Sequence, residues 1–128
     1  MPDKSPPLFT FGAFLMAFTI VLDAFAAHGL KTRLDTYSIE IFYTATRYQL
    51  IHSLALLVLD GTSRLGAHAK RRALTFFSFG IFLFSGSLYL LSLTGIKKFG
   101  MITPFGGMSF ILGWAYIGWS ALAGKNKS

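Results

Sequence analysis

The chain contains no cysteine, which excludes a disulfide scaffold, thiolate catalysis and cysteine-ligated metal sites. Charge is also scarce: only 13% of the residues are charged, where soluble domains carry about 25%. Hydrophobic residues make up 53% of the 128 positions, and 14 positions are phenylalanine. This composition excludes intrinsic disorder, and a domain of this size has too little interior to hide so much apolar surface from water. The sequence therefore predicts a membrane protein.

Charged residues divide the chain into four apolar stretches. A hydrocarbon core about 30 Å thick needs about 20 helical residues, and backbone groups in lipid must bond to one another, which favours helices. The predicted spans are residues 8–27, 41–60, 73–93 and 104–123. We expect one all-α domain, a four-helix antiparallel transmembrane bundle in which neighbours in sequence are neighbours in space.

The second span has the weakest apolar signal. Its charge-free part, Tyr48–Leu59, forms only about 18 Å of helix, which is too short to cross the bilayer. The helix must therefore begin near Asp35 and carry Arg47 into the outer layer of the membrane, where its guanidinium can reach water. Glu40, Thr44 and Arg47 share one face of this helix.

A cleaved signal peptide is an alternative for the first span. Lys4 forms a weak positively charged region, and residues 24–26 read Ala-Phe-Ala, which resembles a cleavage site. Three further apolar spans would still need to be anchored, so we expect the first span to be retained.

The basic residues predict an orientation. With four spans, the termini and the loop 60–72 lie on one side with seven lysines and arginines, and the other side holds five. The strongest local signal is the cluster Lys70, Arg71 and Arg72 beside the third span. By the positive-inside rule, both termini are expected in the cytoplasm. The basic loops suit anionic membrane lipids, and no basic stripe with interleaved aromatics indicates a nucleic-acid site.

Each span carries a stripe of small or polar residues, which is typical of helix contacts in lipid, where close approach and interhelical hydrogen bonds drive packing. The remaining phenylalanines and leucines are expected to face lipid or to pack on one another. The expected contact residues are Gly12, Met16, Thr19, Asp23 and Ala27 in the first span, Ala45, Gln49, His52, Ser53, Leu56 and Asp60 in the second, Ser78, Ser85, Gly86, Tyr89 and Ser92 in the third, and Gly106, Gly107, Ser109, Gly113 and Ser120 in the fourth.

Four blocks of sequence resemble one known family. They read AFAAHGLK from Ala24, YQLIHSLALL from Tyr48, LFSGSLYLLSLTG from Leu83 and ITPFGGMSFILGW from Ile102. In this order and spacing they resemble domain of unknown function 423, a family of small four-helix membrane proteins whose animal members are called transmembrane protein 256. The family pattern usually has glycine where this chain has Asp23 and Ala26. The resemblance implies a plasma or organellar membrane, here a bacterial inner membrane, and no established activity.

His52 lies about halfway along the charge-free part of the second span, with Tyr48, Gln49 and Ser53 one turn away or less. These neighbours could orient an imidazole that relays protons or binds a polar head group. The alternative is a neutral histidine bonded across the bundle to a serine or backbone carbonyl, for example in a turn at residues 85–87, which includes Ser85 and Ser87.

Asp23 is the ionisable residue of the first span, near its outer end. An intramembrane carboxylate is a candidate functional group, but apolar residues in the same span return enough free energy for the helix to insert. The alternative is an interfacial carboxylate that pairs with Arg47 or Lys31.

No catalytic constellation is recognised, and the histidines lack the spacing of metal ligands, so neither a cofactor nor a metal is predicted. We expect a structural or interaction component of the membrane that assembles with itself or with a larger complex. The alternative is a binder or carrier of a lipid or other small amphiphile held between the helices by His52, Gln49 and the serines. An enzyme is the least supported class.

Overall fold

The computed structural model describes residues 6–125, which form helices and no strands. Lys4 and Lys127, which contribute to the predicted charge asymmetry, lie outside the described residues. The first helix, α1, runs from Leu8 to Phe25 and continues as a π-helical segment over Ala26–Leu30. Together they make an uninterrupted apolar rod of 23 residues.

The second helix, α2, runs from Thr36 to Gly61, so its predicted start near Asp35 is confirmed. The Asp35 carboxylate caps the helix by accepting a 2.8 Å hydrogen bond from the Ser38 amide. That bond stabilises the ionised form and holds the pKa of Asp35 below its ordinary value. The cap explains how a helix with few strong apolar signals in its first turns begins where it does.

Three segments form the third rod: α3 over Ala67–Gly80, a π-helical stretch over Ile81–Ser85, and α4 over Gly86–Thr94. The rod ends at Gly95, whose φ of 72° allows its amide to bond the Leu91 carbonyl at 2.8 Å. The suggested turn at residues 85–87 is wrong, because all three residues lie within this rod. The basic cluster at residues 70–72 lies in the first turns of α3 rather than in a loop.

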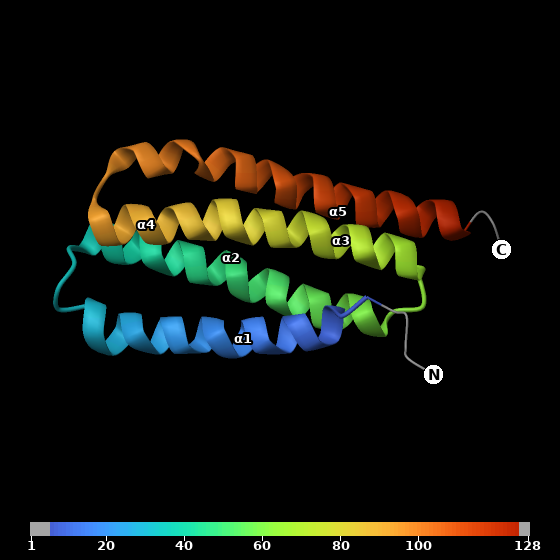
Figure 1. Cartoon of the computed structure of the whole chain (residues 1–128), viewed down its shortest axis with the longest axis horizontal. Coiled ribbons are helices and arrows are strands. Elements are labelled where there is room, and N and C mark those ends of the chain that lie inside the picture. Colours follow the sequence, from blue (N-terminus) through green and yellow to red (C-terminus); the bar gives the residue numbers. More distant parts are fainter. Residues whose placement is uncertain (1–5, 126–128) are drawn as a thin grey trace.

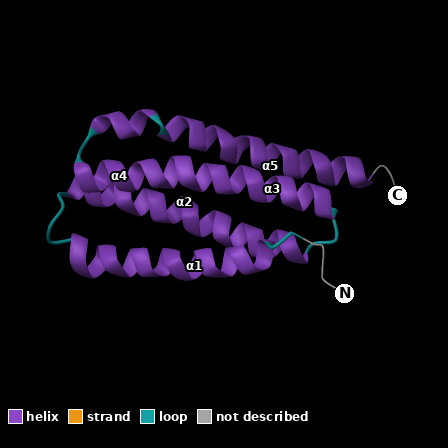
Figure 2. Cartoon of the chain, viewed as in Figure 1, coloured by secondary structure: helices purple, strands orange, loops and turns teal. Residues whose placement is uncertain are grey.

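The last helix, α5, runs from Thr103 to Lys125 and follows a short 3₁₀ turn over Lys97–Met101. The four rods are antiparallel, and each packs on its neighbour in sequence (Figures 1 and 2). Within the described residues, no extensive packing joins α1 to α5. The all-α antiparallel bundle is therefore confirmed, and it is open along that side.

Large apolar side chains cover the outside of the bundle. Phe14, Phe82 and Phe105 are 70–75% exposed, as expected for residues that face lipid. Two buried apolar clusters lie inside, one around Leu56 and Phe77 and one around Phe42. Most of the buried polar side chains lie along α2 and the rod that follows it, and they form the candidate site.

Within residues 6–125, three rods are long and apolar enough to cross a membrane: 8–30, 67–94 and 97–124. The α2 helix is not among them, although it packs against α1 along the same length of the bundle (Figure 1).

Candidate functional site

Both ring nitrogens of His52 are hydrogen bonded. Trp114 Nε1 on α5 lies 3.0 Å from His52 Nε2, and His52 Nδ1 lies 2.6 Å from the Tyr48 carbonyl oxygen. An indole nitrogen only donates, so Nε2 is the acceptor and carries no proton. The proton therefore lies on Nδ1, which donates to the Tyr48 carbonyl. The geometry fixes a neutral imidazole whose polar atoms are both occupied.

The expected partner of His52 across the bundle was a serine or a backbone carbonyl, and this is wrong. The partner on another helix is the Trp114 indole, and the carbonyl belongs to the preceding turn of α2 itself. Ser53 likewise bonds within α2, donating to the Gln49 carbonyl at 2.6 Å.

Aromatic rings enclose the His52 imidazole. Phe110 stacks on it with centroids 3.7 Å apart, and Phe77 meets it edge-on at 4.8 Å. Beside these rings lies a mostly apolar groove of about 480 Å³, whose wall also includes Tyr48 and Trp114. Trp114 and Ile111 are substantially exposed there, so the groove opens to the lipid-facing surface.

Gln49 joins three helices. Its Nε2 donates to Thr19 Oγ1 on α1 at 2.8 Å, and its Oε1 accepts from the Tyr89 hydroxyl on α4 at 2.7 Å. Thr19 in turn donates to the Leu15 carbonyl at 2.7 Å. The Gln49 side chain is 1% exposed, so these bonds satisfy an amide that water does not reach.

Serine hydroxyls make most of the remaining polar contacts between helices in the described part of the chain, and Lys70 Nζ on α3 donates to the Asp60 carbonyl on α2 at 2.8 Å. Ser85 donates to the Ala45 carbonyl on α2 at 2.8 Å, and Ser109 on α5 donates to the Phe76 carbonyl on α3 at 2.7 Å. The hydroxyls of Ser87 and Thr103 lie 2.6 Å apart and join α4 to α5. Ser85, Ser87 and Ser109 of the predicted serines thus join helices, whereas Ser92, like Ser53, bonds a carbonyl of its own helix.

Small residues let α5 approach the third rod. A Cβ at Gly106 would overlap the backbone of Phe84, and one at Gly113 would lie 2.9 Å from Phe77 Cε1. Gly107 has room, since its nearest neighbour would be 3.7 Å away. Gly86 makes no such close contact, because a Cβ there would meet only the Ile81 carbonyl oxygen, at 4.0 Å.

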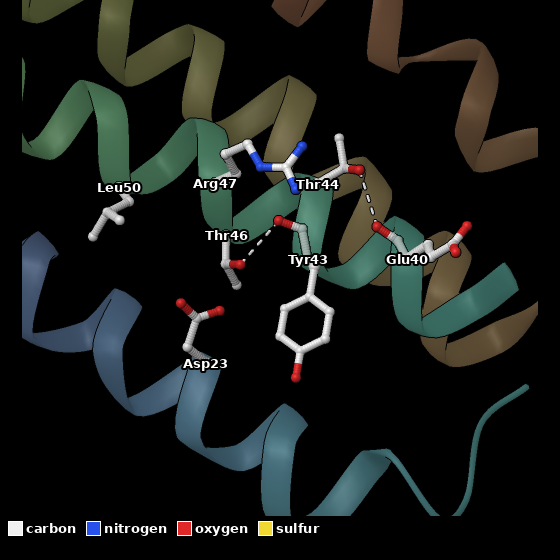
Figure 3. Close-up of a pocket in the computed structure, with 7 residues that line it drawn as sticks. All are labelled: Asp23, Glu40, Tyr43, Thr44, Thr46, Arg47 and Leu50. Atoms are coloured by element: carbon white, nitrogen blue, oxygen red, sulfur yellow. Dashed lines mark hydrogen bonds between the residues drawn. The ribbon is translucent and has the colours of Figure 1, made fainter. Parts of the chain in front are cut away.

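A polar pocket of about 590 Å³ lies between α1 and the first half of α2 (Figure 3). Asp23 reaches it from α1, and one of its carboxylate oxygens is buried without a hydrogen-bond partner. Arg47 also lines the pocket, but the predicted ion pair of Asp23 with Arg47 or Lys31 is not formed within the described residues. Nowhere in the described part of the chain do three or more histidine, cysteine, aspartate or glutamate residues gather as a metal site would require.

Sequence reasoning missed Trp114 and Phe110, which complete the surroundings of His52. A signal for Trp114 was available, because an indole N–H in an apolar span must find an acceptor. Nothing in the sequence singles out Phe110 among the 14 phenylalanines.

Comparisons with known proteins agree with this architecture. The profile of a family described as Protein of unknown function (DUF423) matches residues 22–107. The chain is 41% identical over 106 residues to a UPF0382 membrane protein of Staphylococcus saprophyticus, covering 80% of this chain and 86% of the relative. It is 39% identical over 110 residues to the UPF0382 membrane protein YwdK of Bacillus subtilis, with coverages of 83% and 88%.

A more distant relative carries a more specific name. The UPF0382 inner membrane protein YgdD of Escherichia coli is 34% identical over 116 residues, covering 84% of this chain and 83% of the relative. No solved structure matches the chain. The relatives' names give a membrane location and no activity.

Proposed function

Because the chain belongs to the DUF423 family of membrane proteins, which has no established activity, we propose that it is a structural component of the bacterial inner membrane. In this proposal it acts through contacts with copies of itself or with larger membrane complexes. The location follows the name of the Escherichia coli relative, which is an inner membrane protein.

The main support for a structural role is the state of the interior polar groups. His52 uses both ring nitrogens, Gln49 uses both ends of its amide, and Ser85 bonds a backbone carbonyl on another helix. Interior polar groups whose hydrogen bonds are all made within the bundle serve to hold helices together in lipid. A carrier of an amphiphile between the helices would instead need some of these groups to point into an interior cavity.

The structural role is tested by His52→Phe, which keeps a ring on Phe110 but removes both hydrogen bonds. We expect the free energy of unfolding to fall by roughly 0.6–1.7 kcal/mol, the range of a hydrogen bond between membrane helices, because only the bond to Trp114 joins two helices. The lipids and other small molecules retained by the purified protein in native mass spectrometry should not change.

A matched control for this substitution is His68→Phe, because His68 is exposed at the start of α3. It should leave stability unchanged. If His52→Phe keeps full stability but loses a bound amphiphile, the interior is a ligand site and the structural proposal is wrong.

We further propose four crossings, with both termini in the cytoplasm. The α2 helix has 26 residues, about 39 Å of helix, and it packs on α1 and α4 with Thr46, Gln49 and Ser53 buried. Arg47 is exposed, which allows its guanidinium to reach the membrane surface. The start of α1, the end of α5 and the loop before α3 lie at one end of the bundle, which places the basic cluster 70–72 beside them (Figure 1).

Reporter fusions test the topology. Fusions after Gly66 and after Lys125 should both give a cytoplasmic signal, and fusions after Arg33 and Lys98 should give the external signal. If the fusions at Gly66 and Lys125 report opposite sides, α2 does not cross and the four-span proposal fails.

A further inference from the structure

The pocket between α1 and the first half of α2 is separate from the hydrogen-bonded interior. It holds about 590 Å³, which lies within the roughly 300–1,000 Å³ of small-molecule sites. Its wall consists of Asp23 from α1 and Glu40, Tyr43, Thr44, Thr46, Arg47 and Leu50 from α2. The pocket lies toward the end of the bundle opposite the start of α1, at the depth where charged and aromatic residues meet the membrane surface (Figures 1 and 3).

Asp23 supplies the observation that points to a ligand. The partly exposed Asp23 side chain lines the pocket, and its buried carboxylate oxygen has no hydrogen-bond donor within the described residues. An unpaired carboxylate within a membrane helix is unfavourable, and such groups are normally paired. No described side chain of the protein therefore supplies the cation that would pair with the Asp23 carboxylate.

Two threonines line the pocket, Thr46 on the side of Asp23 and Thr44 on the side of Arg47 (Figure 3), and neither supplies a donor. Thr44 Oγ1 donates to the Glu40 carbonyl at 2.9 Å, and Thr46 Oγ1 donates to the Tyr43 carbonyl at 3.0 Å. Both hydroxyl hydrogens are thus committed to the helix backbone. These hydroxyls can offer the pocket only oxygen lone pairs, and the lone pairs of Thr46, beside Asp23, suit the hydrogens of an ammonium group.

The two sides of the pocket differ in charge. In Figure 3 the Asp23 carboxylate points from α1 toward Thr46, and the Arg47 guanidinium points away from Asp23, on the side of Thr44. A guanidinium binds phosphate through charge-assisted hydrogen bonds. With Asp23 and Glu40 against Arg47, the wall has one excess negative charge, so a ligand that is only anionic is disfavoured.

We propose that this pocket binds an aminoalkyl phosphate group, with its ammonium on Asp23 and its phosphate on Arg47. Phosphatidylethanolamine and free phosphoethanolamine share this chemistry. Binding of the lipid head group would hold the rim of the bundle at the membrane surface, and it uses none of the groups that hold the helices together.

Native mass spectrometry of the full chain tests the proposal, with phosphatidylethanolamine and phosphatidylglycerol supplied in equal amounts. We expect phosphatidylethanolamine to be retained in preference, and Asp23→Asn to weaken its binding about tenfold, as loss of one charge-assisted contact implies. Arg47→Gln should weaken it as well. Asp60→Asn is the matched control, since it removes a carboxylate at the other end of α2 and should leave the preference unchanged.

Free phosphoethanolamine distinguishes the two sources of the ligand. Displacement of the lipid by millimolar phosphoethanolamine supports recognition of the head group from either source, and lipid binding without displacement supports the lipid as the ligand. Asp23→Asn should fold at least as stably as the native chain, because it removes an unpaired carboxylate, so lost binding is not a folding defect. The proposal is overturned if Asp23→Asn binds phosphatidylethanolamine like the native chain, or if phosphatidylglycerol binds equally well.

Discussion

Gly106→Ala is expected to lower the free energy of unfolding by about 3 kcal/mol, at the upper end of the typical range for overpacked sites. The added methyl group would overlap the backbone nitrogen and Cα of Phe84, which no rotamer change can move aside. Relief requires α5 to shift away from the third rod, which strains the contact between Ser87 and Thr103. Unfolding in mixed micelles, followed by tryptophan fluorescence, measures the loss.

Two neighbouring glycines provide controls for this prediction. A Cβ at Gly107 would meet Phe84 at an ordinary 3.7 Å, and one at Gly118 would meet nothing within 4 Å. Alanine at either position should leave stability unchanged or raise it slightly, since alanine is the better helix former. If Gly106→Ala behaves like Gly107→Ala, α5 does not approach the third rod as closely as described.

The fold could be predicted from the sequence because its main signals are local. The spacing of charges separates the apolar rods. A chain of this size cannot bury so much apolar surface inside itself in water, so the rods must lie in lipid. The start of α2 at its Asp35 cap followed from the length that a membrane helix needs. The π-helical stretches at 26–30 and 81–85 could not be foreseen, since their extra residue per turn depends on contacts with neighbouring helices.

For the candidate site, the sequence predicts which residues face the inside of the bundle but not which hydrogen-bond partners they meet. Periodicity placed Thr19, Gln49 and Tyr89 on inward stripes, and the structure brings these three together. It could not show that Trp114, rather than a serine, reaches His52, because that depends on how α5 is rotated and how far it is shifted along the bundle. Ion pairing of Asp23 was expected from charge alone, but the orientation of its helix leaves the carboxylate without that partner.

Hydrogen bonds and close contacts share the work of packing in this bundle. The α5 helix is held against the third rod mainly by glycine contacts and serine hydroxyls, as at Gly113 and Ser109. On the other side, α1 approaches α2 at Gly12, where a Cβ would lie 3.0 Å from the Ser53 carbonyl oxygen. Gln49 is the one described side chain that bonds α1 and α4 at once, so its loss should affect three rods together.

Gln49→Leu should therefore lower the free energy of unfolding by about 1–3 kcal/mol, because it removes two bonds worth roughly 0.6–1.7 kcal/mol each in a membrane. Leucine nearly preserves the volume, so the lost amide, rather than a cavity, accounts for the change. The half-buried Tyr89 hydroxyl would remain without its acceptor. Unfolding in mixed micelles again provides the measurement.

A double-mutant cycle with Tyr89→Phe shows whether the loss arises from this bond. In the Tyr89→Phe background no hydroxyl is left unpaired, so Gln49→Leu should cost less by about 0.5–1.5 kcal/mol, a coupling expected of directly bonded residues. Tyr48→Phe is a suitable second background, because the structure shows no side-chain hydrogen bond between Tyr48 and Gln49, and there the cost should be unchanged. Equal costs in all three backgrounds would show that Gln49 acts by packing alone, and that the bond to Tyr89 does not hold α2 to α4.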